Sequence, residues 1–154
     1  MFVDVQNIYY TTRDTFAKQF NYRLLWQELI AQGDVVLANA YAIQRSDDQQ
    51  HKFQKALKHI GFNVKLKPFI QRSDGSAKGD WDVGITIDIM AAAADDNIDI
   101  IVLLSGDGDF DLLLSHIKAE YGVKTVVYGV PNLTANSLIH ATDEYHKIEQ
   151  SLLL

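Results

Sequence analysis

Four aspartates have the chemistry and the positions expected of a divalent-cation site. Asp107 and Asp109 directly follow a run of branched apolar residues, 98–104, that reads as a strand buried on both faces. Asp4 lies at the end of the first apolar run, and Asp82 lies in the first turn of a predicted helix. Hard cations such as Mg²⁺ and Mn²⁺ bind carboxylate oxygens, and a few acids from separate elements suffice. Such a site activates water and stabilises in-line displacement at phosphorus.

The same acids also have simpler structural explanations. An aspartate at the start of a helix accepts hydrogen bonds from free backbone N–H groups, which would account for Asp107 and Asp109 without any metal. Taken alone, Asp4 reads as a loop acid after a strand. Asp88 follows Asp82 by six residues, so the two side chains point about 120° apart on a helix. Asp88 is therefore either a buried polar anchor or a more distant member of the site.

The apolar pattern predicts strands that alternate with helices. Because the connections are short, this alternation predicts an α/β domain with a mostly parallel sheet of five or six strands and helices on both faces. The predicted strands are 2–5, 34–43, 62–69, 98–104, 124–130 and 144–148, and the predicted helices are 8–20, 22–31, 49–60, 80–94, 108–121 and 136–141. A polar loop is expected at 71–79.

This architecture sets the conditions under which the acids meet. In a parallel sheet the carboxyl ends of all strands share one edge, and ligands bind there. Asp4 and Asp107 therefore approach each other if their strands are neighbours. Asp82 joins them only if its helix begins at the same edge.

Length and composition indicate one globular domain. The chain has 154 residues, of which 47% are hydrophobic and 22% charged, which is ordinary for a soluble protein. We expect a single domain over 1–150 and a short tail at 151–154. The first strand is short for a central strand, so we expect the natural chain or its relatives to extend upstream.

Several classes of protein are disfavoured. The chain has no cysteine, which excludes disulfides and zinc–thiolate sites. It has neither an 18-residue apolar run nor a signal peptide, so we expect a cytoplasmic protein without a membrane span. The five histidines lack the spacing of metal ligands.

Charge is segregated along the chain. The net charge of −6 argues against tight, non-specific binding of nucleic acid. However, seven of the 14 Lys and Arg residues fall in 52–78, whereas 79–117 has nine acids and neither Lys nor Arg. The segregation indicates either two solvated faces of opposite sign or an acidic metal pocket beside a basic arc that receives a polyanion.

Three motifs together are more specific than any one alone. They are a strand followed by DxxN at 4–7, KGxxDV at 78–83 followed by Asp88, and SGDxDF at 105–110. In type, order and spacing they resemble the NYN domain family, the LabA-like branch of the PIN-like nuclease group, over nearly the whole chain. The resemblance implies a three-layer α/β/α, PIN-like (Rossmann-like) fold, and an Mg²⁺- or Mn²⁺-dependent ribonuclease that hydrolyses RNA phosphodiester bonds.

The resemblance also implies roles for individual residues. It makes Asp4, Asp82, Asp107 and Asp109 the metal ligands and catalytic acids, with Asn7 and Ser105 as auxiliary polar groups towards substrate. Lys78 and Arg72, on the loop before the acidic helix, are candidates for contacts with RNA phosphates. The alternative is a non-catalytic RNA-binding or regulatory module with a degenerate nuclease site. A phosphatase acting on a small substrate and assembly as a homo-oligomer also remain open.

Overall fold

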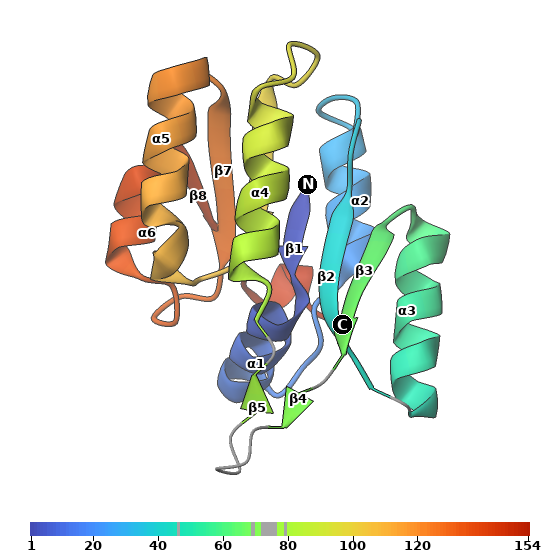
Figure 1. Cartoon of the computed structure of the whole chain (residues 1–154). Helices are drawn as coiled ribbons and strands as arrows, with labels where there is room; N and C mark the ends of the chain where they lie inside the picture. Colours follow the sequence, from blue (N-terminus) through green and yellow to red (C-terminus); the bar gives the residue numbers. More distant parts are fainter. Residues whose placement is uncertain (46, 69, 72–76, 79) are drawn as a thin grey trace.

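The fold is built on a six-stranded parallel sheet (Figure 1). The computed structural model describes the chain except for residues 46, 69, 72–76 and 79. Its strands lie in the order β3-β2-β1-β6-β7-β8, and every neighbouring pair is parallel. The strands are β1 (Phe2–Asp4), β2 (Asn39–Gln44), β3 (Asn63–Pro68), β6 (Ile100–Leu104), β7 (Lys124–Gly129) and β8 (Glu144–Lys147).

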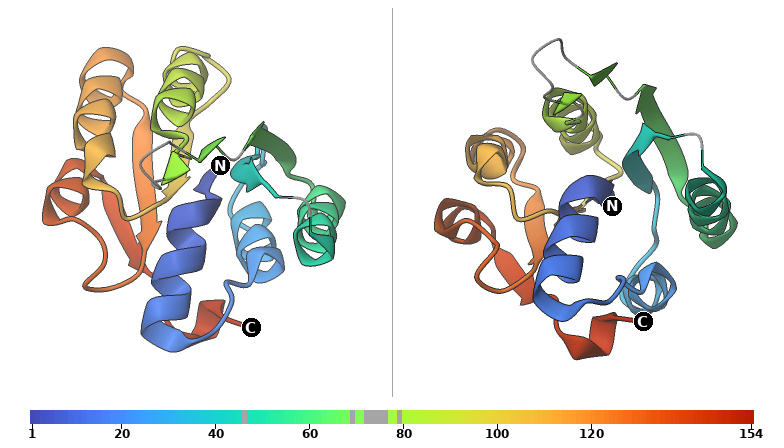
Figure 2. Two further views of the ribbon diagram at one scale, coloured as in Figure 1. Left: turned by 60° about the horizontal axis from the view of Figure 1, so that its bottom comes forward. Right: turned by 90° about the horizontal axis from the view of Figure 1, so that it is seen from below.

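Helices cover both faces of this sheet, which confirms the predicted three-layer architecture. On one face lie α1 (Val5–Phe16), α2 (Tyr22–Ile30) and α3 (Asp48–Ile60), and on the other α4 (Asp82–Ala93), α5 (Asp111–Tyr121) and α6 (Asn136–Ala141), as the end-on view in Figure 2 shows. The described residues also form two 3₁₀ turns, η1 (Gly108–Phe110) and η2 (Gln150–Leu152). Within the described residues, no helix is long and apolar enough to cross a membrane.

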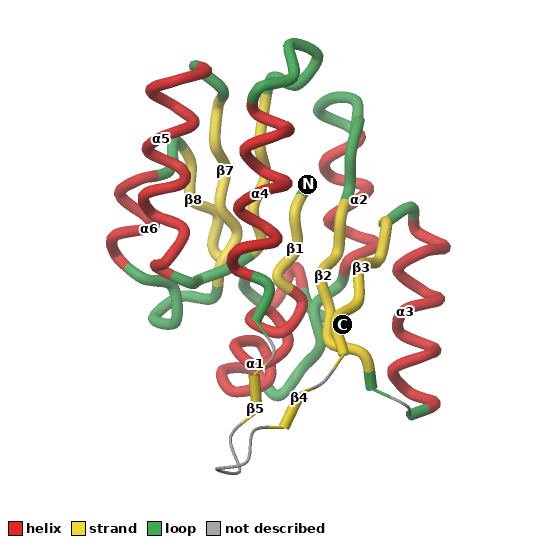
Figure 3. The backbone as a smooth tube through the Cα atoms, in the orientation of Figure 1, coloured by secondary structure: helices red, strands yellow, loops and turns green. Residues whose placement is uncertain are grey.

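The sheet reverses its winding between β1 and β6. The chain moves outward from β1 through β2 to β3, returns to β6 beside β1, and then continues outward to β8. In open α/β sheets, ligands bind at the carboxyl ends of the strands where the winding reverses. Figure 3 shows that α1 and α4 begin at this edge, and the small hairpin of β4 (Ile70–Gln71) and β5 (Ala77–Lys78) lies beside the start of α4.

Burial explains the apolar runs in the sequence. Val3, Leu103 and Leu104 of the two central strands are completely buried, as expected for a sheet covered on both faces. Ile8 and Leu25 belong to the core cluster on one face of the sheet. The alternating strand β3 lies at the sheet edge and is only partly buried, as its sequence predicts.

The structure differs most from the predicted elements at four places. The helix predicted at 108–121 begins as the 3₁₀ turn η1 and continues as α5 from Asp111. The strand predicted at 34–43 begins at Asn39, because Asn39 pairs with Phe2 and Asn63, the first residues of the two neighbouring strands. The helix predicted at 8–20 begins at Val5 and ends at Phe16. It ends there because Ala17 adopts a left-handed conformation with φ of 54°. The predicted polar loop begins at the last residue of β4 and contains β5, and its residues 72–76 and 79 lie outside the described residues.

Candidate metal centre

The pairing of β1 with β6 sets the position of Asp4. The strands pair Val3 with Leu104, so the next residues, Asp4 and Ser105, emerge side by side at the carboxyl edge. The Ser105 hydroxyl donates to Asp4 Oδ2 at 3.1 Å. Asp4 also caps α1, accepting from the Asn7 N–H at 3.4 Å. The carboxylate is only 9% exposed and is held from two sides.

The loop after β6 is hydrogen-bonded to the start of α1. The Asn7 side-chain oxygen accepts from the Gly106 N–H at 2.9 Å, and the Asp107 N–H donates to Ser105 Oγ at 3.1 Å. Asp107 itself caps η1, accepting from the Asp109 N–H at 2.9 Å. These bonds give Asn7 and Ser105 an observed role, which is to position the acidic loop relative to Asp4.

Gly106 allows this loop to pack closely against the segment before α6. A Cβ at this position would lie 2.5 Å from the Leu133 carbonyl oxygen, closer than a Cβ approaches a non-bonded atom in folded proteins. The Gly106 carbonyl also accepts from the Ala135 N–H at 3.0 Å. A side chain at residue 106 would therefore displace Asp107.

Asp82 completes the cluster because α4 begins at the same edge of the sheet. It is the first residue of that helix, and its N–H donates to Asp80 Oδ1 at 3.2 Å. One carboxylate oxygen from each of Asp4, Asp82 and Asp107 lies within 4.8 Å of the other two. Asp82 therefore joins Asp4 and Asp107 because its helix begins at the carboxyl edge of the sheet, which is the condition that the sequence-based prediction set.

The three carboxylates open into a hollow of about 240 Å³. It is lined by Asp4, Gln6, Asn7, Tyr10, Thr11, Asp80, Asp82 and Asp107, which we call the acidic pocket. Among the ion pairs between described residues, none includes a carboxylate of this pocket. Four acids therefore face one small space without a described cationic partner.

Burial and mutual repulsion disfavour ionisation in the acidic pocket. Burial raises the pKa of Asp4 to about 6, against the opposing hydrogen bonds from Asn7 and Ser105. Desolvation raises the pKa of Asp82 to about 7, and the charges of Asp107 and Asp80 add to the rise. A divalent cation would offset this repulsion, and carboxylate oxygens are the ligands that Mg²⁺ and Mn²⁺ prefer. The residues present thus fit such an ion.

Comparison with known proteins identifies the family. The family model of the NYN domain matches residues 1–149. The chain belongs to the NYN domain family. It is 30% identical over 153 residues to the low amplitude and bright protein LabA of Synechococcus elongatus, an alignment that covers 94% of this chain and 80% of LabA. A crystal structure of a protein of unknown function from Vibrio parahaemolyticus is 48% identical, with a TM-score of 0.93 over 99% of this chain and 93% of the other.

Three further predicted site residues of this NYN domain do not belong to the close carboxylate group. Two of them lie in the described part of the chain, and the third lies outside it. The Asp109 side chain is exposed and does not belong to the close carboxylate group. Lys78 lies in β5, four residues before the start of α4. Arg72 falls outside the described residues. Their roles stay predictions.

Sequence reasoning did not assign several residues that line the acidic pocket. Asp80 precedes Asp82 by two residues, and its carbonyl oxygen accepts from Lys67 Nζ at 3.3 Å. Gln6, Tyr10 and Thr11 lie on the same face of α1 as Asn7, and this helical spacing is the signal that would have found them. A cation, Lys67, therefore lies at the rim, next to Asp80.

Asp88 and Trp81 have structural roles. Asp88 accepts from the Tyr41 hydroxyl at 2.8 Å and from Lys65 Nζ at 2.7 Å. Partial burial acts to raise the pKa of Asp88, but these hydrogen bonds outweigh it and hold the pKa below its ordinary value. The Trp81 indole N–H donates to the Ala42 carbonyl oxygen at 2.9 Å, and the ring packs against Tyr41. Asp88 is thus the polar anchor of α4 on the sheet, the first of its two predicted roles.

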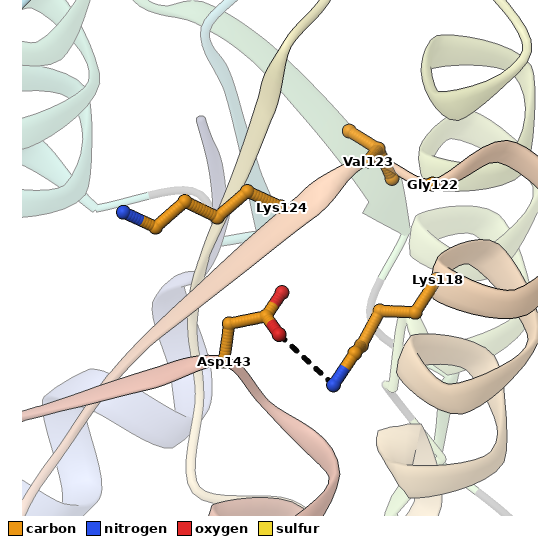
Figure 4. A pocket seen from close by; sticks show the side chains of 5 residues that line it. All are labelled: Lys118, Gly122, Val123, Lys124 and Asp143. Carbon is orange, nitrogen blue, oxygen red and sulfur yellow. Dashed lines mark ion pairs between the residues drawn. The ribbon is translucent and has the colours of Figure 1, made fainter.

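A second hollow, of about 370 Å³, lies at the opposite edge of the sheet (Figure 4). Its charged groups are already paired: Lys118 Nζ lies 2.9 Å from Asp143 Oδ1, and Asp143 Oδ2 also accepts from the Thr125 N–H at 2.9 Å. The Thr125 hydrogen bond and the Lys118 ammonium lower the pKa of Asp143. The charges in this hollow therefore form a structural salt bridge, in contrast to the acidic pocket, in which several carboxylates lie close together.

Proposed function

We propose that this NYN domain is an Mg²⁺- or Mn²⁺-dependent ribonuclease whose metal is held by Asp4, Asp82 and Asp107. The observation that carries the proposal is the convergence of three carboxylate oxygens within 4.8 Å at the point where the winding of the sheet reverses. Membership of the NYN family supports a nuclease-like site. Asp109, which follows Asp107 by two residues, is a further predicted ligand.

The residues of the chain prepare this site for a phosphodiester. When bound, a divalent ion supplies Lewis-acid activation of water and neutralises charge that develops at phosphorus. Ser105 and Asn7 fix the orientation of Asp4 and of the loop that carries Asp107. Lys67, at the rim beside Asp80, supplies positive charge for a phosphate, as Lys78 and Arg72 are predicted to do.

Cleavage of labelled RNA with Mg²⁺, Mn²⁺ or excess EDTA tests the proposal. We expect metal-dependent cleavage by the wild-type protein and a loss of at least about 100-fold in Asp107→Asn, since changes beyond the ligands of a metal already cost 10- to 100-fold. Asp96→Asn is the matched control because Asp96 is exposed in the loop before β6, at the opposite edge of the sheet. Equal cleavage by all three proteins, or none with several unrelated RNAs, would contradict the proposal.

The test also separates the alternative of a non-catalytic RNA-binding module. Binding of RNA that survives Asp107→Asn, without cleavage by the wild-type protein, would favour that alternative. Contacts to phosphates would show as affinity that falls steeply with salt. A cytoplasmic location remains the prediction from the sequence.

A further inference from the structure

Two tyrosines lie on the helix that borders the acidic pocket. Tyr10 lines the pocket one turn after Gln6, and Tyr9 is 47% exposed. Their rings meet edge to face, with centroids 5.3 Å apart. An exposed tyrosine and a half-buried one beside a candidate active site offer aromatic surface to a ligand with a flat apolar face.

Arg13 extends this aromatic surface. Its guanidinium carbon lies 4.8 Å from the ring centroid of Tyr10 and 5.4 Å from that of Tyr9. Arg13 is exposed, and its ion pair with the exposed Asp14, at 3.2 Å, is of the weak surface kind. We call Tyr9, Tyr10 and Arg13 the aromatic platform. It combines π faces with a planar cation that both stacks and binds phosphate.

We propose that the aromatic platform binds an unpaired base of a single-stranded RNA whose neighbouring phosphate lies at the acidic pocket. The placement of the phosphate rests on the proposed function. Stacking on aromatic side chains tolerates every base, because every base has a π face. Bases inside an A-form duplex are already stacked and paired, so the platform selects single strands over duplexes.

The aromatic platform would give this acidic protein a source of RNA affinity that does not depend on positive charge. The acidic pocket repels RNA in the absence of a metal, and the net charge of the protein is −6. Stacking on Tyr10 contributes affinity that does not depend on neutralising phosphates. Loss of the Tyr10 ring should therefore leave the salt dependence of binding unchanged, whereas loss of Arg13 should lower the slope of log K against log salt by about 0.7, the value for one single-strand phosphate contact.

The experiment measures binding and not cleavage. Fluorescence anisotropy with a labelled single-stranded RNA is read for variants made in the Asp107→Asn protein. We expect Tyr10→Ala to weaken binding by about 5- to 150-fold, which corresponds to the loss of one stacked base, and Tyr10→Phe to bind within about twofold of its parent. Tyr121→Ala is the matched control because Tyr121 is a tyrosine with 44% exposure at the far end of α5, and it should bind as its parent does. Melting curves confirm that each variant is folded.

Single abasic nucleotides in the RNA locate the stacked base. At one position the abasic RNA should bind the parent and Tyr10→Ala with equal affinity, because the base that would stack is absent. Equal affinities of Tyr10→Ala and Tyr121→Ala for intact RNA would overturn the proposal. So would equal binding of duplex and single strand, or no binding of any single strand by the wild-type protein. Tyr10-dependent binding without wild-type cleavage would refute the nuclease alone, and cleavage without Tyr10 dependence would refute the platform alone.

Discussion

Asp4→Asn should stabilise the metal-free fold at alkaline pH although it removes a candidate metal ligand. Asp4 is buried, and burial raises its pKa from 3.8 to about 6. Above that pH the wild-type protein holds a buried carboxylate that the unfolded chain exposes to water. Asparagine keeps the shape of the side chain, and its oxygen can still accept from the Asn7 N–H. The substitution therefore removes charge while it retains the helix cap.

The size of the effect follows from the pKa of Asp4. One pKa unit corresponds to 1.36 kcal/mol, so the rise to about 6 costs about 3 kcal/mol of folding free energy at pH 8, where Asp4 is ionised in both states. Well below pH 3.8 the carboxyl is protonated in both states and the cost vanishes. At pH 5 about half of the cost remains. The stabilisation by Asp4→Asn should accordingly grow with pH between about 4 and 7.

Urea unfolding in EDTA at pH 5 and pH 8 measures this difference. The gain in unfolding free energy from Asp4→Asn should be about 1.5 kcal/mol larger at pH 8 than at pH 5. Adding Mn²⁺ at pH 8 should reverse the ranking, because an ion that binds only the folded wild-type site stabilises it by mass action. A variant that is less stable than the wild type by the same amount at both pH values would refute the reasoning, since the buried charge would then carry no cost.

Two further substitutions test the geometry of the centre. Gly106→Ala should lower the unfolding free energy by about 1–3 kcal/mol and abolish stabilisation by Mn²⁺, because the added Cβ would clash with the Leu133 carbonyl oxygen. Gly33→Ala is the control: the space around Gly33 is open, so this substitution should have neither effect. Asp109→Asn should weaken Mn²⁺ binding in calorimetry by less than Asp107→Asn does, because Asp109 is exposed and outside the close carboxylate group. Equal losses would instead assign Asp109 to the metal directly.

The order of elements was predictable because each carries a strong local signal. Asn21 and Asp47 are the N-caps of α2 and α3, each accepting from the backbone N–H three residues later, and Gly61 and Gly122 follow the ends of α3 and α5. The start of β2 was not predictable, since residues 34–38 contain strand-forming valines. β2 begins at Asn39 because the neighbouring strands β1 and β3 begin at the residues that pair with it. The residues around Asn39 in the sequence do not encode this position.

The candidate site was predictable only in part for a similar reason. Asp4 and Asp107 follow buried strands, so a parallel sheet alone brings them to one edge. Asp82 depends on the path of the chain between β3 and α4, which places the start of α4 at that edge. Asp80 reaches the pocket through the turn before α4, which only the packed structure defines, whereas Tyr10 shares a face of α1 with Asn7 and could have been found from that spacing.

Helix capping and metal binding, which compete as explanations in the sequence, are compatible in the structure. Asp4 caps α1 and Asp107 caps η1, each accepting one backbone hydrogen bond. An ionised carboxylate has about four acceptor sites on its two oxygens, so a cap leaves capacity for a cation. The capping bonds also hold each carboxylate in one orientation before any ion arrives, which lowers the cost of ordering the ligands. The capping hydrogen bonds are therefore one way in which the fold holds mutually repelling carboxylates close to one another.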